Sequence, residues 1–536
     1  MLFKKLKKMS VLQVTVFLLA AAFAIIITAC PSEDLGGKIT EEGGEDYITT
    51  LNWGISTQAD VKTLGLQPGN NTTEINLNWY SSGTPANKVA QVRFVRGTFT
   101  DGKELIQVTT GGTVNNASSN NTQHKATVTG LRPGASYQYA VSSDGTNWSD
   151  AYDFKVPAAT GAFKFAVIAD PQLHSTSWDS LNRYTPAGGA KTGEGWKETM
   201  TKIVNHGVSF IASGGDQVDA SGGNETEYDL FYAPQGLRNL PFAPVSGNHD
   251  NHLNFNYHYN LPNAQAFDDE TVATEKGRNY YYLYNNILFV VLNTAPYPGS
   301  TSAAKPNVKR FDDTLTAAKV AHSGKYDWLI VQHHKSTASV ADHLADRDIQ
   351  YYVEAGFETV MSKHKVDFVL AGHDHVYARS YPLEGKDDGK VSVPDKSAGQ
   401  THTYTNPGKP IYLTFTTGSG LKYYAVSSDK TSVYNNTLYV KDNAMYPYLG
   451  EVTDAAGTSS TYYGSTAYMN DKRLPVSNAA FVQPYIPSYC ITEVNGKTIK
   501  FSTYAIATAN GQVTGAEQPY SFDANTPYDW VQVTKN

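Results

Sequence analysis

Apolar runs that end in polar residues recur along the middle of the chain. Six of them stand out: FKFAVIAD, VSFIASGGD, FAPVSGNHD, ILFVVLNT, DWLIVQHH and VDFVLAGHDH. Runs that are apolar at consecutive positions are typical of strands buried on both faces. Between them, residues 195–207 and 349–365 have helical spacing. Strands that alternate with helices predict an α/β fold from residue 161 onward, with functional groups at the carboxyl ends of the strands.

Two further patterns refine this picture. In the stretch 195–207, one helical face is expected to carry four apolar residues, Trp196, Met200, Ile203 and Val204. After residue 409, the strand-like run IYLTFTTGSG precedes a stretch, 425–478, that is rich in Gly, Ser, Tyr and Asn and is expected to be a surface insertion. A β-hairpin is then predicted around Asn495 and Gly496.

Residues 49–158 follow a shorter, alternating pattern. Strand-like segments such as INLNWYS, AQVRFV, HKATVTG and SYQYAVSS are separated by turn residues. This pattern predicts an all-β sandwich of roughly 100 residues, and the run from 129 to 157 resembles a fibronectin type III-like or immunoglobulin-like domain. Its expected core positions are Leu131, Tyr137, Tyr139 and Trp148.

The first thirty residues form a separate segment with a pattern of its own. Four lysines precede an apolar segment, residues 11–27, and a small-residue ending leads to Cys30. This pattern resembles a bacterial lipoprotein signal, with Cys30 as the lipid-modified residue. The alternative is an uncleaved membrane anchor. The apolar segment has 17 residues, however, and a helix that spans a bilayer needs roughly 20. Both alternatives predict an extracytoplasmic, membrane-anchored protein at the cell surface or in the periplasm. Residues 31–48, acidic and Gly-rich, are expected to be a flexible tether.

Composition excludes some functions. The 36 tyrosines and 44 glycines among 536 residues favour a β-rich protein with long loops. The net charge of −7 gives no sign of the basic surface that is typical of nucleic-acid-binding proteins. Besides Cys30, the sequence holds one cysteine, Cys490, which is expected to be a buried structural thiol.

Oxygen and imidazole donors gather at the ends of the apolar runs. Each is weak evidence alone, because such residues also cap helices and form turns. Together they suit two divalent or trivalent cations such as Mn, Fe, Zn or Mg, with no cysteine among the donors. The donors are Asp170 with Gln172, Asp216 with Asp219, Asn248 with His249, the pair His333 and His334, and His373 with His375.

The order of the blocks D-P-Q, GGDQVD, GNHD, HH and GHDH resembles the calcineurin-like metallophosphoesterase superfamily over residues 161–417, and more weakly to the end. With the preceding sandwich, the chain resembles bacterial proteins related to purple acid phosphatases. The resemblance implies a two-sheet α/β sandwich, a βαβαβ core flanked by helices, spanning residues 161–536 with a C-terminal β extension. The expected order is signal (1–30), tether (31–48), sandwich (49–158) and phosphoesterase domain.

The resemblance also implies roles for the donors. The first metal position takes Asp170, Gln172, Asp216 and His375, and the second takes Asp216, Asn248, His333 and His373, so that Asp216 bridges both. The pattern favours His333 over His334, which is then a neighbour of the site. A metal-bridging hydroxide attacks phosphorus in line. His249 is the candidate general acid or transition-state stabiliser, and Asp250 either orients it or is an ordinary turn residue.

Two positions depart from the family pattern. Purple acid phosphatases owe their colour to a ferric-bound tyrosinate three residues after the bridging aspartate, where this chain has Asp219. No purple chromophore is therefore expected. Most other members have Asp-x-His in the first block, where this chain has Gln172. Because an amide oxygen is a neutral and weaker donor, the first metal is expected to bind less tightly or to be more oxophilic.

Three functions fit these residues. The first is hydrolysis of phosphate monoesters, as in an acid phosphatase. The second uses the same metals on diesters or nucleotides. The third is a surface binding lipoprotein whose phosphoesterase domain is inactive. Three further residues near the motifs, Lys335, Tyr377 and Arg379, are candidates for binding substrate phosphate, with ordinary solvation as the alternative. No oligomeric state is predicted.

Overall fold

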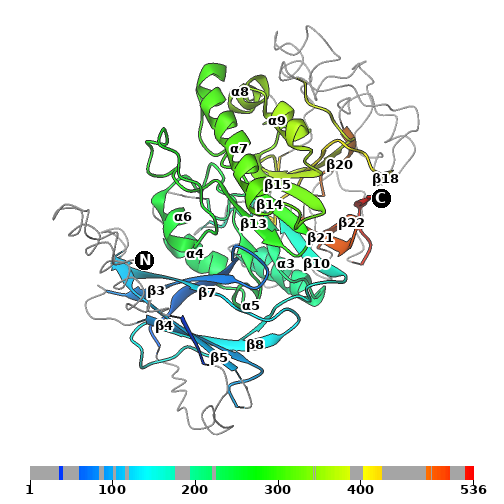
Figure 1. Cartoon of the computed structure of the whole chain (residues 1–536). Coiled ribbons are helices and arrows are strands. Elements are labelled where there is room, and N and C mark those ends of the chain that lie inside the picture. Colours follow the sequence, from blue (N-terminus) through cyan, green and yellow to red (C-terminus); the bar gives the residue numbers. More distant parts are fainter. Residues whose placement is uncertain are drawn as a thin grey trace, which may run out of the picture.

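The computed structural model describes thirteen stretches of the chain: residues 36–39, 59–83, 90–100, 104–114, 120–174, 193–219, 225–341, 343, 346–386, 402–424, 478–484, 486–506 and 525–536. They form a β-sandwich that lies against a larger α/β part (Figure 1). The predicted signal 1–30, with Cys30, and nearly all of the 425–478 stretch lie outside the described residues.

The sandwich has two antiparallel sheets, ordered β1-β5-β4-β8-β9 and β2-β3-β7-β6. Its core contains the expected Leu131, Tyr137 and Tyr139, and Trp148 is buried in a smaller cluster beside it. Within the predicted tether, one short segment adds an edge strand by backbone pairing with β5. The strands are β1 (Gly36–Ile39), β2 (Lys62–Pro68), β3 (Ile75–Ser82), β4 (Ala90–Arg96), β5 (Glu104–Thr110), β6 (Gly112–Val114), β7 (Asn121–Val128), β8 (Ser136–Ser142) and β9 (Tyr152–Lys155).

The α/β part contains two seven-stranded sheets packed face to face, as predicted. The first has the order β12-β11-β10-β21-β22-β23-β18 and the second β13-β14-β15-β16-β19-β17-β20. Phe165, Phe289 and Phe501 meet in the apolar layer between them. The first sheet consists of β10 (Phe163–Ile168), β11 (Ile211–Ser213), β12 (Phe242–Ala243), β18 (Thr403–Thr405), β21 (Ser488–Asn495), β22 (Thr498–Ala505) and β23 (Asp529–Thr534), and the second of β13 (Tyr280–Tyr284), β14 (Ile287–Val291), β15 (Trp328–Lys335), β16 (Phe368–Gly372), β17 (Tyr377–Ser380), β19 (Ile411–Thr414) and β20 (Asn478–Val482).

Helices cover the outer faces of both sheets (Figure 1). Over the first sheet lie α3 (Glu194–Asn205), α4 (Glu225–Tyr232), α5 (Gly236–Asn239) and α6 (Leu253–His258). Over the second lie α7 (Thr301–Ala321), α8 (Arg347–Glu354) and α9 (Phe357–His364). The strands that alternate with these helices, β10 to β12 and β14 to β16 with β19, run parallel within their sheets, so their carboxyl ends share one edge.

Two details of the predicted helices are wrong. Val204 is 45% exposed, whereas Trp196, Met200 and Ile203 are buried as expected. At 100° per residue, Val204 falls at the edge of the face that the other three share. The stretch 349–365 is two helices, because Gly356 takes a left-handed conformation with φ of 98° and separates α8 from α9.

The sandwich holds the segment that follows His249. Strand β7 faces α6, where Lys125 Nζ donates to the carbonyl of Asn256 at 2.6 Å and Gln123 Nε2 donates to that of Tyr257 at 3.0 Å. In return, Asn260 Nδ2 donates to the carbonyl of Ala126 at 3.0 Å. The position of α6 therefore depends on the sandwich.

Three smaller predictions can be checked. Strands β21 and β22 form the expected hairpin around Gly496, whose φ is +53°. Cys490 is buried, and burial raises the pKa of its thiol to about 12. Among the residues that the structure describes, no helix is both long and apolar enough to cross a membrane.

Candidate metal centre

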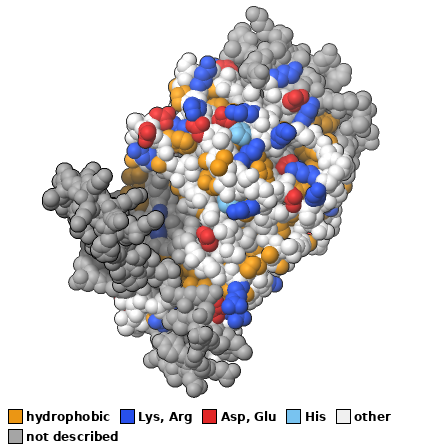
Figure 2. Space-filling model, viewed as in Figure 1, with side chains coloured by type: hydrophobic (Ala, Val, Ile, Leu, Met, Phe, Trp, Pro, Cys, Tyr) orange, Lys and Arg blue, Asp and Glu red, His pale blue; other side chains and the backbone are white. Residues whose placement is uncertain are grey.

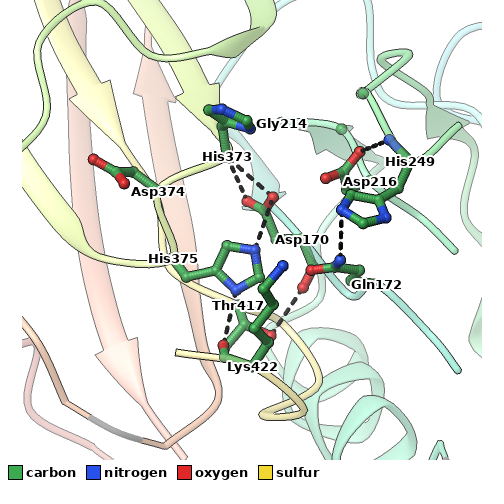
Figure 3. A network of polar contacts seen from close by, with 12 residues as sticks. Asp170, Gln172, Gly214, Asp216, His249, His373, Asp374, His375, Thr417 and Lys422 are labelled. Atoms are coloured by element: carbon green, nitrogen blue, oxygen red, sulfur yellow. Dashed lines mark hydrogen bonds and ion pairs between the residues drawn. The ribbon is translucent and has the colours of Figure 1, made fainter. Parts of the chain in front are cut away.

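The donors predicted from sequence meet at the carboxyl edges of the two sheets. Asp170 follows β10, Asp216 follows β11, and Asn248 lies in the loop after β12. From the second sheet, His334 is the second-last residue of β15, and His373 and His375 follow β16. Figure 3 shows Asp170, Gln172, Asp216, His373 and His375 around one common space.

Four donor atoms converge at the second metal position. His334 Nε2 lies 3.1 Å from Asp216 Oδ2, 3.0 Å from Asn248 Oδ1 and 3.1 Å from His373 Nδ1. The Nδ1–H of His334 donates to the carbonyl of Gly214 at 2.8 Å. This bond leaves the lone pair of the neutral imidazole on Nε2, the atom that faces the other donors.

Three further donors belong to the first metal position, and the Asp216 carboxylate interacts electrostatically with two of them, Asp170 and His375. His375 Nε2 lies 3.5 Å from Asp170 Oδ1, and its Nδ1–H donates to the carbonyl of Lys422 at 2.8 Å. Gln172 is 1% exposed, and its Oε1 has no hydrogen-bond partner in the described protein. A buried amide oxygen without a partner is costly, and a cation held by Gln172 would relieve this cost.

The structure reverses the expected roles of the histidine pair. His333 is not brought to the donor group: its ring lies 4.7 Å from that of Phe357, under α9, and neither ring nitrogen has a hydrogen-bond partner among the described residues. Burial and the neighbouring His334 lower the pKa of His333 to about 3. Side chains alternate across a strand, so when His334 faces the other sheet His333 must face the helices. His334 is therefore the donor.

Backbone strain is concentrated at the donors. Asp170, Gln172, Asp216, His373 and His375 all have positive φ, between 41° and 76°. Residues other than glycine adopt this conformation uncommonly, Asn, Asp and His more often than the others, and at a cost of about 1–3 kcal/mol each. Such strain persists where the surrounding structure enforces it, and it is typical of functional sites.

Glycines in the motifs allow the backbone to approach the carboxylates. A Cβ atom at Gly247, in GNHD, would lie 1.9 Å from Asp216 Oδ1. A Cβ atom at Gly372, in GHDH, would lie 2.3 Å from Asp170 Oδ2. The amide N–H of His373, next to Gly372, donates to both oxygens of Asp170 at 3.0 and 2.9 Å. Glycine is needed at both positions, because any side chain there would clash with the carboxylates.

The charges at the centre fit cations. Burial raises the pKa of Asp170 well above its ordinary value. Burial acts in the same direction on Asp216, but the charge of His334 and the hydrogen bonds from His334 and the His249 backbone N–H lower the pKa of that carboxyl. Burial alone would lower the pKa of His334, yet Asp216 and Asp170 raise it to about 9. Without a metal ion, an imidazolium takes the place of a cation beside the buried carboxylates.

His249 has a different partner from the one expected. Asp250 does not contact it: the Asp250 carboxylate is buried and accepts hydrogen bonds from the backbone N–H of Gly247 at 3.0 Å and of Gln217 at 3.2 Å. It thus fixes the turn that presents Asn248. His249 instead lies against Asp219, donating from Nδ1 to the Asp219 carbonyl at 2.7 Å.

Two residues that sequence reasoning missed complete the site. His343, whose ring stacks on His373 with 4.2 Å between centroids, hydrogen-bonds through Nδ1 to Asp346 Oδ2 at 2.6 Å. Lys422 lies in the loop after β19, which is held by the Thr417 hydroxyl donating to the Asp170 carbonyl at 2.8 Å. The Lys422 ammonium interacts electrostatically with three site carboxylates, Asp216, Asp219 and Asp170. Burial lowers the pKa of Lys422, and these carboxylates oppose that shift.

The three other candidates for phosphate binding are engaged elsewhere. Lys335 is buried and pairs with Asp348 at 2.6 Å. Tyr377 and Arg379 are buried against Asp529, with the Arg379 Nε 2.6 Å from Asp529 Oδ2. This ion pair ties β23 to β17, so these residues are part of the core of the fold.

Comparison with known proteins follows the same division of the chain. Residues 163–377 match the family described as Calcineurin-like phosphoesterase. This part of the chain is a calcineurin-like phosphoesterase domain. Residues 61–156 match the family described as Purple acid Phosphatase, N-terminal domain, so the phosphoesterase domain follows a purple acid phosphatase N-terminal domain.

Two relatives match more than half of the chain at low identity. Two uncharacterized proteins of Mycobacterium tuberculosis, from strains CDC 1551 / Oshkosh and ATCC 25618 / H37Rv, are each 23% identical over 357 residues. The match covers 62% of this chain and 64% of theirs, less than two thirds of their length. A purple acid phosphatase from yellow lupin (Lupinus luteus) seeds is similar in structure, with a TM-score of 0.56 at 15% identity over 89% of this chain and 75% of that one. At this identity the likeness concerns the fold.

Proposed function

We propose that this protein is a dinuclear metal-dependent phosphoesterase that hydrolyses phosphate monoesters. One observation carries the proposal: buried donors from the ends of both sheets gather around Asp216, which contacts His334 and interacts electrostatically with Asp170. Asp170, Gln172 and His375 would hold the first ion, and Asn248, His334 and His373 the second. Fe, Mn, Zn and Mg ions all suit oxygen and imidazole donors.

When bound, two such ions supply a nucleophile from water at neutral pH and offset the negative charge of a phosphoryl group. The chain's own residues bind and orient the ester around them. The Lys422 ammonium is placed to donate to a phosphate oxygen, because once the carboxylates hold cations it faces the anion of the substrate. His249, at the same edge, contacts the phosphoryl group from the side of Asn248.

Hydrogen-bond roles assign the proton of His249. The Asp219 carbonyl can only accept, so His249 Nδ1 is the donor; the Gln172 amide nitrogen, 2.9 Å from His249 Nε2, can only donate, so Nε2 is the acceptor. In this state His249 holds no proton to give from Nε2. His249 can donate to the phosphoryl group only after Nε2 takes up a proton and releases the Gln172 amide, so His343, paired with Asp346, is a second candidate for protonating the leaving oxygen.

The experiment is a metal-reconstituted assay of the full chain with aryl phosphate monoesters and diesters, run beside His249→Ala. Faster turnover of the monoester supports the proposal, and preference for the diester favours a phosphodiesterase or nucleotidase. Absence of turnover with Mn, Fe, Zn or Mg favours the binding lipoprotein with an inactive domain. Unchanged turnover in His249→Ala contradicts the role of that residue.

We further propose that the enzyme is anchored to a membrane through lipidated Cys30 and acts outside the cytoplasm. The support for this is the sequence of residues 1–30 alone. Mass spectrometry of the protein purified from membranes tests it, since a diacylglyceryl-modified Cys30 is expected at the mature N-terminus. An intact N-terminal Met1 on the purified protein would contradict it.

A further inference from the structure

Asp219 is fixed beside the first metal position by backbone pairing. The Asp219 N–H donates to the carbonyl of Leu173 at 3.0 Å, and the Gln172 N–H donates to that of Asp216 at 2.8 Å. Residues 172–173 and 216–219 therefore run side by side as one unit. Asp219 and Gln172 cannot move apart without breaking this pairing.

The Asp219 carboxylate accepts a hydrogen bond from Gln172 and lies close to two histidines. Its Oδ1 lies 2.7 Å from the amide nitrogen of Gln172 and 3.4 Å from His249 Nδ1. Its Oδ2 lies 3.1 Å from His174 Nε2. No other carboxylate among the described residues contacts Gln172 in this way, and the side chain of Asp219 is 15% exposed, at the mouth of the site.

These contacts decide which way the Gln172 amide points. Both N–H groups of the amide are used, one by Asp219 Oδ1 and the other by His249 Nε2. A flipped amide would place its oxygen against the Asp219 carboxylate, where two acceptors repel each other. The amide oxygen Oε1 is therefore turned away from Asp219, and it is the buried atom that lacks a protein partner. Figure 3 shows the Gln172 side chain beside Asp170 and joined to His249.

We propose that Asp219 is a positioning residue of the first metal position: it holds the Gln172 amide so that Oε1 faces the ion, and it holds His249 through the same hydrogen-bond network. This inference rests on the proposed dinuclear site. Because the donors there are one carboxylate, one neutral amide, one imidazole and the shared Asp216, we infer that the position takes a divalent, oxygen-preferring cation such as Mn²⁺.

The test is a double-mutant cycle on metal affinity, measured by calorimetric titration of Mn²⁺ into the metal-free full chain. The four proteins are the wild type, Asp219→Asn, Gln172→Ala and the double variant. Partners behind a metal ligand typically account for 10- to 100-fold in affinity, so Asp219→Asn is expected to weaken one of the two Mn²⁺ sites by that factor. In the Gln172→Ala background, the same change is expected to have no further effect.

Three results would overturn the inference. Unchanged Mn²⁺ affinity in Asp219→Asn means that the carboxylate does not position the ligand. Additive losses in the double variant mean that Asp219 binds the ion itself. If the wild type binds no Mn²⁺, the inferred preference for Mn²⁺ fails; the proposed function fails with it only if Fe²⁺, Zn²⁺ and Mg²⁺ also do not bind.

Two controls accompany the cycle. Asp268→Asn removes an exposed carboxylate and is expected to leave both affinities unchanged. Thermal unfolding of the metal-free variants checks that the fold is kept, and Asp219→Ser replaces Asp219→Asn if the latter unfolds early. If Asp219 has only a structural role, Asp219→Asn lowers the unfolding temperature, but its effect on Mn²⁺ affinity is not non-additive with that of Gln172→Ala.

Discussion

His334 Nε2 lies 3.1 Å from Asp216 Oδ2, and this contact joins the two sheets at their shared edge. Asp216 follows β11 of the first sheet, and His334 is the second-last residue of β15 in the second. The centre therefore exists only when both sheets are packed together. Ions bound there are expected to stabilise the folded chain by mass action.

The histidine pair gives a matched comparison. His334→Ala is expected to remove the second metal ion and to lower turnover by at least 100-fold, because it deletes a ligand. His333→Leu, one residue away, is expected to keep two ions and near-normal turnover, with an unfolding free energy within about 2 kcal/mol of the wild type. Metal content by mass spectrometry and turnover of an aryl phosphate check both. Loss of the metal in His333→Leu but not in His334→Ala would restore the expectation from sequence.

Strand alternation explains why the pair was assigned wrongly. In β15, Trp328 and Ile330 belong to the layer between the sheets, whereas Leu329 and Val331 belong to the layer under the helices. His334 continues the first series and His333 the second. Both series are apolar, so the sequence predicted a strand buried on both faces and could not tell which face was which.

The sequence predicted more of the centre than of its surroundings. Asp170, Asp216, Asn248, His373 and His375 each follow an apolar strand, and the common edge of parallel strands brings such residues together. Their partners come from loops whose paths depend on tertiary packing. Lys422 and His343 reach the site in this way, and no periodic pattern marks them.

Replacing Gln172 with histidine is predicted to tighten binding of the first metal ion. Gln172→His is expected to strengthen binding of the first ion by about tenfold, since imidazole is a stronger donor than an amide oxygen. The other ring nitrogen of the new histidine can then donate a hydrogen bond to Asp219. Metal-ligating histidines commonly donate their second N–H to a carboxylate in this way. Competition of the variant and the wild type for Zn²⁺ against a chelator measures this. Equal or weaker affinity would count against Gln172 as a ligand.

Lys422 is predicted to act on substrate binding. Lys422→Ala is expected to raise KM for an anionic aryl phosphate by 10- to 100-fold, the equivalent of about 1.5–3 kcal/mol for a charged hydrogen bond. Lys422→Arg, which keeps the charge, is expected to recover part of this loss. Inhibition by inorganic phosphate should weaken in parallel. The control is Lys305→Ala, on the exposed face of α7; an equal change in the control would refute a specific role for Lys422.

Glu358 makes stability depend on pH, away from the metal centre. This side chain of α9 is 1% exposed, and burial raises its pKa to about 7, with the Thr337 hydroxyl opposing the shift. The folded chain thus holds a proton that the unfolded chain releases near pH 4.3. Because the folded state binds more protons in this window, the free energy of unfolding should fall as pH rises from about 4.3 to 7.

Glu358→Gln removes this dependence, because its amide carries no charge. At pH 8 the variant is expected to be more stable than the wild type by up to about 3 kcal/mol, and at pH 4 the two should be nearly equal. Urea unfolding in the presence of a chelator, at both pH values, measures the difference. A difference that is the same at the two pH values would show that Glu358 does not titrate in the folded state within this range.

Two metal ions bound around Asp216 are proposed to make this chain a phosphoesterase. This is tested by following hydrolysis of an aryl phosphate by the metal-free full chain as Mn²⁺ is added back, with metal content determined at each step. Turnover is expected to rise with added metal and to reach a plateau near two ions per chain, and Asp216→Asn is expected to abolish it. A fully loaded wild type without turnover, or turnover that persists in Asp216→Asn, would show that the two ions do not act in this way.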